Sequence, residues 1–201
     1  MSAPGDDGRP PLRRREAVAR LLAGRDRTLV VSGLGASTYD VAAAGDHERN
    51  FYLWGAMGGA SLIGLGLALA QPAVPVLVIT GDGEMLMGLG GLATIGWQSA
   101  PNLTVVVLDN GVYGETGGQP SHTAGPTDLC AVAAACGIRE TRRVATLPGV
   151  DDLARRSHAV GTGTLFAVVP VDPVEDARVL PSRDGVAIKA RMRAALGLDS
   201  M

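Results

Sequence analysis

The chain has 201 residues, of which 46% are hydrophobic and 3% aromatic, and its 18 Lys and Arg residues nearly balance its 20 Asp and Glu residues. This length fits a single domain with enough apolar residues for a buried core. The balanced charge gives no reason to expect binding to nucleic acid or to an anionic membrane. Two cysteines, Cys130 and Cys136, are too few for a disulfide scaffold or a cysteine-ligated iron–sulfur cluster.

No segment of the sequence is typical of a membrane span or a secretory signal. The longest apolar run, Ala56–Ala70, contains four glycines and covers 15 residues, which is short of the roughly 20 that a membrane span needs. The N-terminus is polar and lacks the apolar segment of a signal peptide. We therefore expect a cytoplasmic protein. We expect residues 1–12 to form a disordered tail, 13–180 one domain, and 181–201 a C-terminal helix and tail.

Short apolar runs alternate with helical patterns along the chain. Helices are predicted over Arg13–Ala23, Ser37–Ala44, Gly58–Ala70, Glu84–Gln98, Val150–Ala159 and Asp184–Leu196, with another from an N-cap at Thr127 to Cys136. Strands are predicted over Thr28–Val31, Asn50–Leu53, Pro75–Thr80, Leu103–Leu108, Glu140–Val144 and Thr164–Val169, and a loop over Gly111–Pro126.

Continuous apolar strands that alternate with helices are typical of a parallel sheet covered on both faces. The sequence therefore predicts an α/β protein with three layers, α/β/α, and a mostly parallel sheet. Ligands of such folds bind at the carboxyl ends of the strands. Four segments fall at predicted strand ends, namely Ser32–Ser37, Trp54–Met57, Gly81–Glu84 and Asp109–Gln119.

The tripeptide Gly81-Asp82-Gly83 follows one of these strands directly. Its glycines allow a sharp turn and a close approach of phosphate to the amides that open the next helix. The Asp82 carboxylate would repel phosphate, unless a divalent cation lies between them and is bound by both. The tripeptide alone also fits an Asp in an ordinary turn. The residues at the end of the next strand are therefore needed to distinguish a metal site from such a turn.

The next predicted strand ends in Asp109-Asn110-Gly111, with 26 residues between Gly83 and Asn110. This spacing accommodates one helix and one strand, so Asp82 and Asn110 are expected on neighbouring strands at the same edge. One carboxylate, one amide oxygen, a backbone carbonyl and diphosphate oxygens, completed by water, suit octahedral Mg²⁺.

Gly-Asp-Gly with Asn at this spacing resembles the motif that binds thiamine diphosphate (ThDP). The resemblance extends through Trp54–Gly58 and Asp109–Gln119, and over about residues 28–125 the chain is similar to the diphosphate-binding domain of sulfopyruvate and phosphonopyruvate decarboxylases. It implies ThDP and Mg²⁺ as cofactors. It also implies that Asp82, the Asn110 side chain and the Val112 carbonyl bind the metal.

The resemblance assigns further positions to the cofactor. The Gly83 and Glu84 amides would lie at the diphosphate, the Gly55 carbonyl would accept a hydrogen bond from the aminopyrimidine, and Met57 would support the bent cofactor. The full set of implied cofactor contacts is Ser37, Gly55, Met57, Gly81, Gly83, Glu84, Asn110, Val112 and Tyr113. The chain departs from the pattern at Ser37-Thr38-Tyr39, where some members carry Ser-Arg-Glu.

The remaining polar residues of interest are Glu84, two residues of the loop after Asn110, and an arginine run near the N-terminus. The helix dipole is sufficient to explain an acidic side chain at Glu84, in a first helical turn. Glu115 and His122 lie in the loop after Asn110 and are candidate substrate contacts, and no catalytic residue is assigned with certainty. We expect Arg13-Arg14-Arg15 to form the solvent-exposed face of a helix rather than a phosphate site.

In the family that the chain resembles, a glutamate from a separate pyrimidine-binding domain activates the cofactor. The chain has enough residues for one domain, and the diphosphate-binding domain accounts for them. We therefore expect a partner chain of similar size that supplies this glutamate. The chain would be the ThDP-binding subunit of a two-component decarboxylase for a small 2-oxo acid with an anionic tail. The alternatives are a 2-oxo acid:ferredoxin oxidoreductase β subunit, a carboligase, or a non-catalytic cofactor-binding module.

Overall fold

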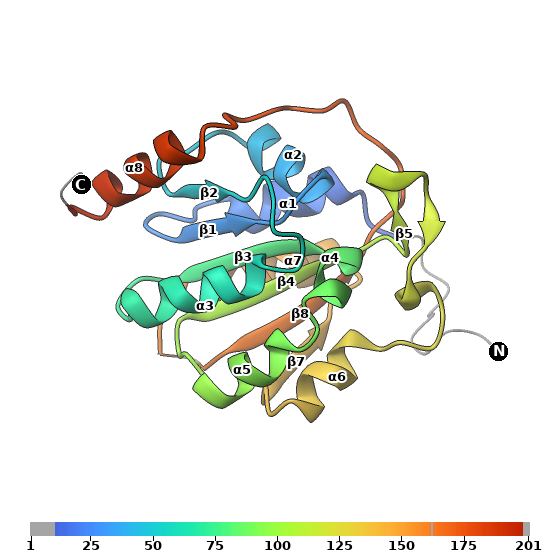
Figure 1. Cartoon of the computed structure of the whole chain (residues 1–201). Coiled ribbons are helices and arrows are strands. Elements are labelled where there is room, and N and C mark those ends of the chain that lie inside the picture. Colours follow the sequence, from blue (N-terminus) through green and yellow to red (C-terminus); the bar gives the residue numbers. More distant parts are fainter. Residues whose placement is uncertain (1–10, 162, 199–201) are drawn as a thin grey trace.

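We describe residues 11–161 and 163–198 from a computed structural model of the chain, and within them six parallel strands form the central sheet (Figure 1). The strands are β1 (Leu29–Ser32), β2 (Asn50–Tyr52), β3 (Val76–Gly81), β4 (Leu103–Asp109), β7 (Glu140–Arg143) and β8 (Leu165–Pro170). Their order across the sheet is β2-β1-β3-β4-β8-β7. All neighbouring pairs are parallel, as the sequence predicts.

Helices cover both faces of this sheet (Figure 1). They are α1 (Arg14–Leu22), α2 (Ala36–Ala43), α3 (Ala60–Ala70), α4 (Asp82–Met87), α5 (Gly91–Gln98), α6 (Leu129–Ala135), α7 (Leu147–Ser157) and α8 (Gly185–Ala195). The helices α1, α2 and α7 pack on one face, and α3 to α6 pack on the other. The predicted three-layer α/β/α architecture is thereby confirmed.

The strands are apolar on both faces because each face meets its own helical layer. Val30 and Leu77 belong to the core under α1, α2 and α7, whereas Leu29 and Val78 belong to the core under α3 to α6. Burying one such side chain contributes about 1.5–3 kcal/mol. Neighbouring residues of one strand therefore stabilise opposite layers, which explains the continuous apolar runs.

The helix predicted over Glu84–Gln98 is wrong, because the structure has two helices there, α4 and α5. Gly88 ends α4, and a Cβ at this position would overlap the backbone of Gly58. The two backbones can approach only because both residues are glycines. The predicted N-cap of α6 is also wrong by one residue, since Asp128 rather than Thr127 accepts the cap hydrogen bond.

The predicted loop after Asn110 contains short regular elements. The strands β5 (Val112–Tyr113) and β6 (Gln119–Pro120) pair as a small antiparallel hairpin. The 3₁₀ turn η1 (Gly114–Thr116) lies between these two strands, and a second one, η2 (His122–Ala124), follows β6. Gly117 and Gly118 both have positive φ at the end of the hairpin loop. This geometry favours glycine and explains why both positions carry it.

The chain ends lie partly outside the described residues. Residues 1–10 of the predicted tail fall there, while Leu12 forms a β-bridge with Val171. After β8, residues 172–184 run without regular secondary structure past α2 to α8 (Figure 1); we call them the crossing segment. None of the helices in the described ranges has both the length and the apolar character that a membrane span requires.

The sheet order places a topological switch beside β3. From β1 the chain crosses to β2 on one side and then returns to β3 on the other side of β1. The loops that follow β1 and β3 therefore separate at the carboxyl edge, and a crevice forms where they diverge. The candidate functional residues lie at this point.

Candidate active site

A cavity of about 180 Å³ opens at the carboxyl edge of the sheet, among the loops after β1, β3 and β4 and the crossing segment. It brings together most of the residues that the sequence assigns to the cofactor, the metal and the substrate. These are Ser37, Met57, Gly81, Asp82, Gly83, Glu84, Asn110, Val112, Tyr113 and Glu115. Two predicted site residues, Gly55 and His122, are exposed and do not line the cavity.

Asp82 is the first residue of α4 and is almost fully buried. Its Oδ2 atom accepts hydrogen bonds from the hydroxyl of Ser121 and from Thr123 Oγ1, the latter at 3.0 Å. Burial raises the pKa of Asp82 above its usual range, the nearby Asp109 charge adds to this, and the two hydroxyl donors oppose it. A cation would relieve the buried negative charge.

Asn110 follows β4 directly and lies in a tight polar turn. Its Oδ1 atom accepts a hydrogen bond from the Val112 N–H at 3.1 Å, across Gly111, which has a φ of +70°. The turn carries the chain into the β5–β6 hairpin, so that the Tyr113 ring packs on Gly83, where a Cβ would overlap it. Gly83 therefore lets Tyr113 close over the start of α4.

The oxygen donors at this edge fit a magnesium ion. The Asp82 carboxylate, the Asn110 amide and the Val112 residue all line the same cavity, and Mg²⁺ prefers such oxygen ligands together with phosphate. Within the described ranges, no group of three or more His, Cys, Asp or Glu side chains could hold a metal. A cation here would depend on amide, carbonyl and ligand oxygens as well as on Asp82.

The side chain of Glu84 connects two loops of the site, which sequence reasoning did not anticipate. Its Oε2 atom accepts hydrogen bonds from the Leu34 N–H at 3.0 Å and from Thr80 Oγ1 at 2.9 Å. A Cβ at Gly33 would overlap Oε2. The two hydrogen bonds hold the side chain between the loop after β1 and strand β3. Burial raises the pKa of Glu84, and the hydrogen bonds oppose this.

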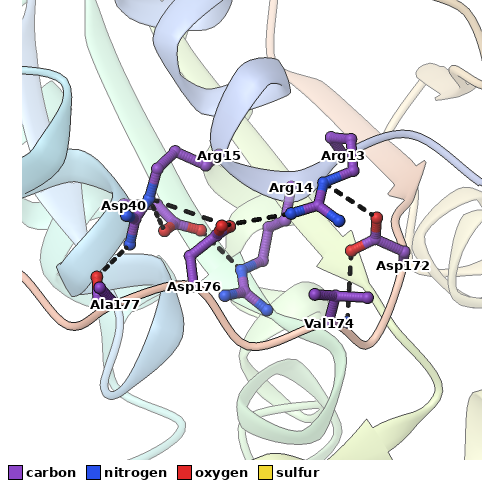
Figure 2. Close-up of polar contacts among 8 residues, drawn as sticks. All are labelled: Arg13, Arg14, Arg15, Asp40, Asp172, Val174, Asp176 and Ala177. Atoms are coloured by element: carbon purple, nitrogen blue, oxygen red, sulfur yellow. Dashed lines mark hydrogen bonds and ion pairs between the residues drawn. The ribbon is translucent and has the colours of Figure 1, made fainter.

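The expectation that Arg13-Arg14-Arg15 forms an exposed face is wrong for Arg14, which is 6% exposed and lines the cavity. Its Nε atom donates to Asp40 Oδ2 at 2.6 Å, and Arg15 Nε donates to Asp40 Oδ1 at 3.0 Å (Figure 2). Asp40 lies in α2 and is fully buried. This buried carboxylate attracts both arginines, which explains the inward position of Arg14.

The crossing segment closes one side of the cavity and is attached to α1 by charged groups. Arg13 forms ion pairs with Asp172 at 3.4 Å and Asp176 at 3.2 Å, while Arg15 Nη2 donates to the Ala177 carbonyl at 2.8 Å (Figure 2). Asp176 itself lines the cavity. Residues far apart in the sequence thus build a common wall.

Further along, the same segment contacts two aromatic residues. The Arg178 guanidinium lies 5.4 Å from the centre of the Tyr39 ring and pairs with Glu115 at 3.5 Å. Trp54 Nε1 donates to the Ser182 carbonyl at 2.7 Å. These contacts position the segment over α2 and the loop that follows β2.

Comparison with known proteins identifies the class to which this fold and site belong. Residues 33–170 match the family model described as thiamine pyrophosphate enzyme, C-terminal TPP binding domain. The match covers more than half of the chain and includes the loops after β1, β3 and β4 that line the cavity, but not Arg14 or the crossing segment. The chain belongs to this family of thiamine pyrophosphate enzymes.

The chain is also similar to individual proteins of known name. The chain is 44% identical over 150 residues to phosphonopyruvate decarboxylase from Streptomyces viridochromogenes, covering 74% of this chain but only 37% of that protein. It is 42% identical over 162 residues to sulfopyruvate decarboxylase subunit beta from Methanothermobacter thermautotrophicus, covering 81% and 83%. The crystal structure of benzoylformate decarboxylase from Polynucleobacter necessarius shares the fold, with a TM-score of 0.67 at 21% identity over 85% of this chain and 35% of that one.

Proposed function

We propose that the chain is the ThDP- and Mg²⁺-binding subunit of a two-component decarboxylase for a small anionic 2-oxo acid of the sulfopyruvate or phosphonopyruvate type. The observation that carries the proposal is the convergence of Asp82, Asn110 and Val112 on one cavity in a member of this family. The names of the relatives at 42% and 44% identity support the substrate class.

In this proposal the β3 and β4 loops hold the charged end of the cofactor. Asp82, the Asn110 side chain and the Val112 carbonyl bind Mg²⁺, and the amides of Gly83 and Glu84 face the diphosphate. The N–H groups in the first turn of a helix have no intrahelical acceptor and suit this role. When bound, ThDP supplies an electron sink that accepts the electron pair left as CO₂ departs.

The remaining assignments concern the other parts of the cofactor and the substrate. Met57 lines the cavity and supports the bent cofactor, while Ser37 and Tyr113 flank the diphosphate end. Gly55 is exposed in the chain by itself, and in this proposal its carbonyl accepts a hydrogen bond from the aminopyrimidine at the interface with a partner subunit. Glu115, at the rim, remains a candidate substrate contact.

The activating glutamate is proposed to come from a pyrimidine-binding partner chain of similar size. Glu84 and Asp82 are buried and hydrogen-bonded within this chain, and Glu115 forms an ion pair with Arg178. The subunit name of the relative whose length the chain nearly spans supports such a division.

Co-expression with the candidate partner chain tests this function. The reconstituted complex should release CO₂ from sulfopyruvate or phosphonopyruvate when ThDP and Mg²⁺ are present, and each chain alone should not. Full activity of this chain alone would overturn the two-component proposal. Turnover only with ferredoxin as electron acceptor would support the oxidoreductase alternative, and turnover only with a second carbonyl compound would support the carboligase. Cofactor binding by the complex without turnover of any of these substrates would support the non-catalytic module.

A further inference from the structure

Arg14 is buried on the side of the cavity formed by α1 and α2, and only part of its guanidinium forms a hydrogen bond. Its Nε atom donates to Asp40 at 2.6 Å, whereas Nη1 and Nη2 have no hydrogen-bond partner among residues 11–161 and 163–198. Arg14 is 6% exposed and lines the cavity. Neither nitrogen is among the fully buried polar atoms that lack a partner in the described residues, so both are accessible from the cavity, and an acceptor that enters it can reach them.

A second buried group in the same wall is also uncommitted. Ser37 is 3% exposed and lines the cavity, and within the described part of the chain its hydroxyl has no hydrogen-bond partner. Ser37 lies in the first turn of α2, an eight-residue helix whose N-cap, Gly35, provides no side-chain cap. The N–H groups of this turn and the helix dipole favour a negative charge beside them.

The charges around this wall include carboxylates of the chain itself. Asp40 is paired with Arg14 of α1 and Asp176 with Arg13, the N-cap of that helix, and Glu115 is paired with Arg178. The Glu115 side chain lies beside Gly35, where a Cβ would come within 2.9 Å of its Cγ. Glu115 is half-exposed at the rim, so an entering anion can displace it from the start of α2.

We propose that Arg14, together with Ser37 and the first turn of α2, forms a binding site for a tetrahedral oxyanion, with Arg14 as its principal cation. The ligand class is a phosphate, phosphonate or sulfonate group. Asp40 fixes the guanidinium through Nε and leaves the two terminal nitrogens as a fork. Such a fork binds two oxygens of a tetrahedral anion at once, which a lysine cannot do.

Two sources could supply this oxyanion. One is the anionic tail of the substrate, and the other is the terminal phosphate of the cofactor. The choice between these sources rests on the proposed function, whereas anion binding at Arg14 does not. The experiment therefore has one arm without turnover and one arm with it.

The first arm uses the full chain alone and measures binding by calorimetry and by the shift of the unfolding temperature. Inorganic pyrophosphate, methylphosphonate and methanesulfonate are the probes. Arg14→Gln should weaken binding of at least one probe about 10- to 100-fold, as expected for loss of a charge-assisted pair. Arg14→Lys should recover part of the affinity because it keeps the charge but not the fork.

Arg15→Gln is the matched control for this arm. Arg15 pairs with the same Asp40 carboxylate at 3.0 Å but is not among the residues that line the cavity. Its replacement should lower the unfolding temperature without weakening any probe. Equal probe affinities in Arg14→Gln, Arg15→Gln and the unchanged chain would overturn the proposal, whatever activity is later found.

The second arm uses the reconstituted complex and identifies the source. If Arg14 binds the substrate tail, Arg14→Gln should raise KM for sulfopyruvate or phosphonopyruvate about 10- to 100-fold and leave KM for tailless pyruvate unchanged. If Arg14 binds the terminal phosphate of the cofactor, Arg14→Gln should raise the Kd of ThDP. The KM for the 2-oxo acid, measured at saturating ThDP, should then stay constant. Should Arg14→Gln fail to fold, Arg14→Lys must still show the weaker probe binding, and unchanged binding would contradict the proposal.

Discussion

The two walls of the cavity are built in opposite ways. Around the β3 and β4 tips, carboxylates meet hydroxyl and amide groups, and Thr123 Oγ1 lies within hydrogen-bond distance of both Asp82, at 3.0 Å, and Asp109, at 2.7 Å. On the α1 side, arginines meet carboxylates, and Arg14 leaves its terminal nitrogens free toward the cavity. One wall thus favours a cation and the other an anion.

This contrast also separates local from distant construction. Thr123 and Asp109 are 14 positions apart and belong to one loop and the strand before it. Arg13 and Asp176, on the opposite wall, are 163 positions apart. The cation wall is therefore set by a short stretch of chain, whereas the anion wall forms only once the whole fold has brought α1 and the crossing segment together.

The largest effect is expected from Asp82→Asn in the cation wall. Changing residues that only support a metal ligand typically costs about 10- to 100-fold in metal affinity, so changing a proposed ligand should cost at least that much. Calorimetry of the reconstituted complex with ThDP and Mg²⁺ measures the loss. Asp109→Asn is the control, since Asp109 contacts Thr123 but does not line the cavity; equal binding in all three proteins would contradict the metal assignment.

The same variant should stabilise the chain in the absence of metal. The pKa of Asp82 is raised in the folded state, so the folded chain binds this proton more tightly than the unfolded chain does. The group therefore lowers stability at neutral pH, and the penalty disappears as the pH falls through the raised pKa. Without Mg²⁺ and at neutral pH, Asp82→Asn should unfold at a higher temperature than the unchanged chain.

Asp40→Asn tests the anion wall and should cost about 3–5 kcal/mol of unfolding free energy, because it leaves the buried Arg14 and the half-buried Arg15 without their carboxylate. Asp152→Asn is a matched control, since Asp152 also pairs with two arginines, Arg142 and Arg155, but its side chain is 58% exposed. That change should cost less than about 1 kcal/mol. Similar midpoints for the two variants in chemical denaturation would contradict the contrast between the walls.

The cation wall was largely predictable because its signals are local. The apolar strands fix the three layers, and Gly81-Asp82-Gly83 and Asn110 follow adjacent strands, so their meeting at one edge requires only a parallel sheet. The break between α4 and α5 was missed because it depends on Gly88 meeting Gly58, a contact between distant backbones. Ser121 and Thr123 were missed because a polar loop does not indicate which hydroxyl turns inward.

The anion wall was not predictable for a related reason. Three successive arginines at the start of a helix point in different directions, and the sequence does not indicate which of them meets a partner. Asp40, 26 positions after Arg14, could have served as a signal, since it is the one charged residue of its helix and an acidic side chain needs a cation if it is buried. The crossing segment offered Asp172, Asp176 and Arg178 among other charged residues of an irregular stretch, with no pattern to show which of them meet α1.

Gly33→Ala tests the connection between the walls and should have a smaller effect. The new Cβ would overlap Glu84 Oε2, so the carboxylate must shift and give up a bond to Leu34 or Thr80. Overpacking of this kind costs about 1–3 kcal/mol. Gly90→Ala is the control, because nothing lies within 4 Å of a Cβ at that position. The double variant with Glu84→Ala should lose less unfolding free energy than the sum of the losses in the two single variants.

The smallest effect is a pH dependence on the α1 side. His158 Nε2 lies 3.0 Å from the Leu21 carbonyl, where it joins the end of α7 to α1. Burial lowers the pKa of His158 below its usual value near 6.5, so the unfolded chain binds this proton more readily. The stability that the neutral ring contributes is therefore present above about pH 6.5 and is lost as the pH falls below it.

His47, whose pKa burial also lowers, acts in the same direction. Thermal unfolding between pH 5 and 8 should show a loss under about 1 kcal/mol on acidification, and His158→Asn should flatten it. An unchanged slope in this variant would show that the contact between α7 and α1 does not depend on the charge of His158.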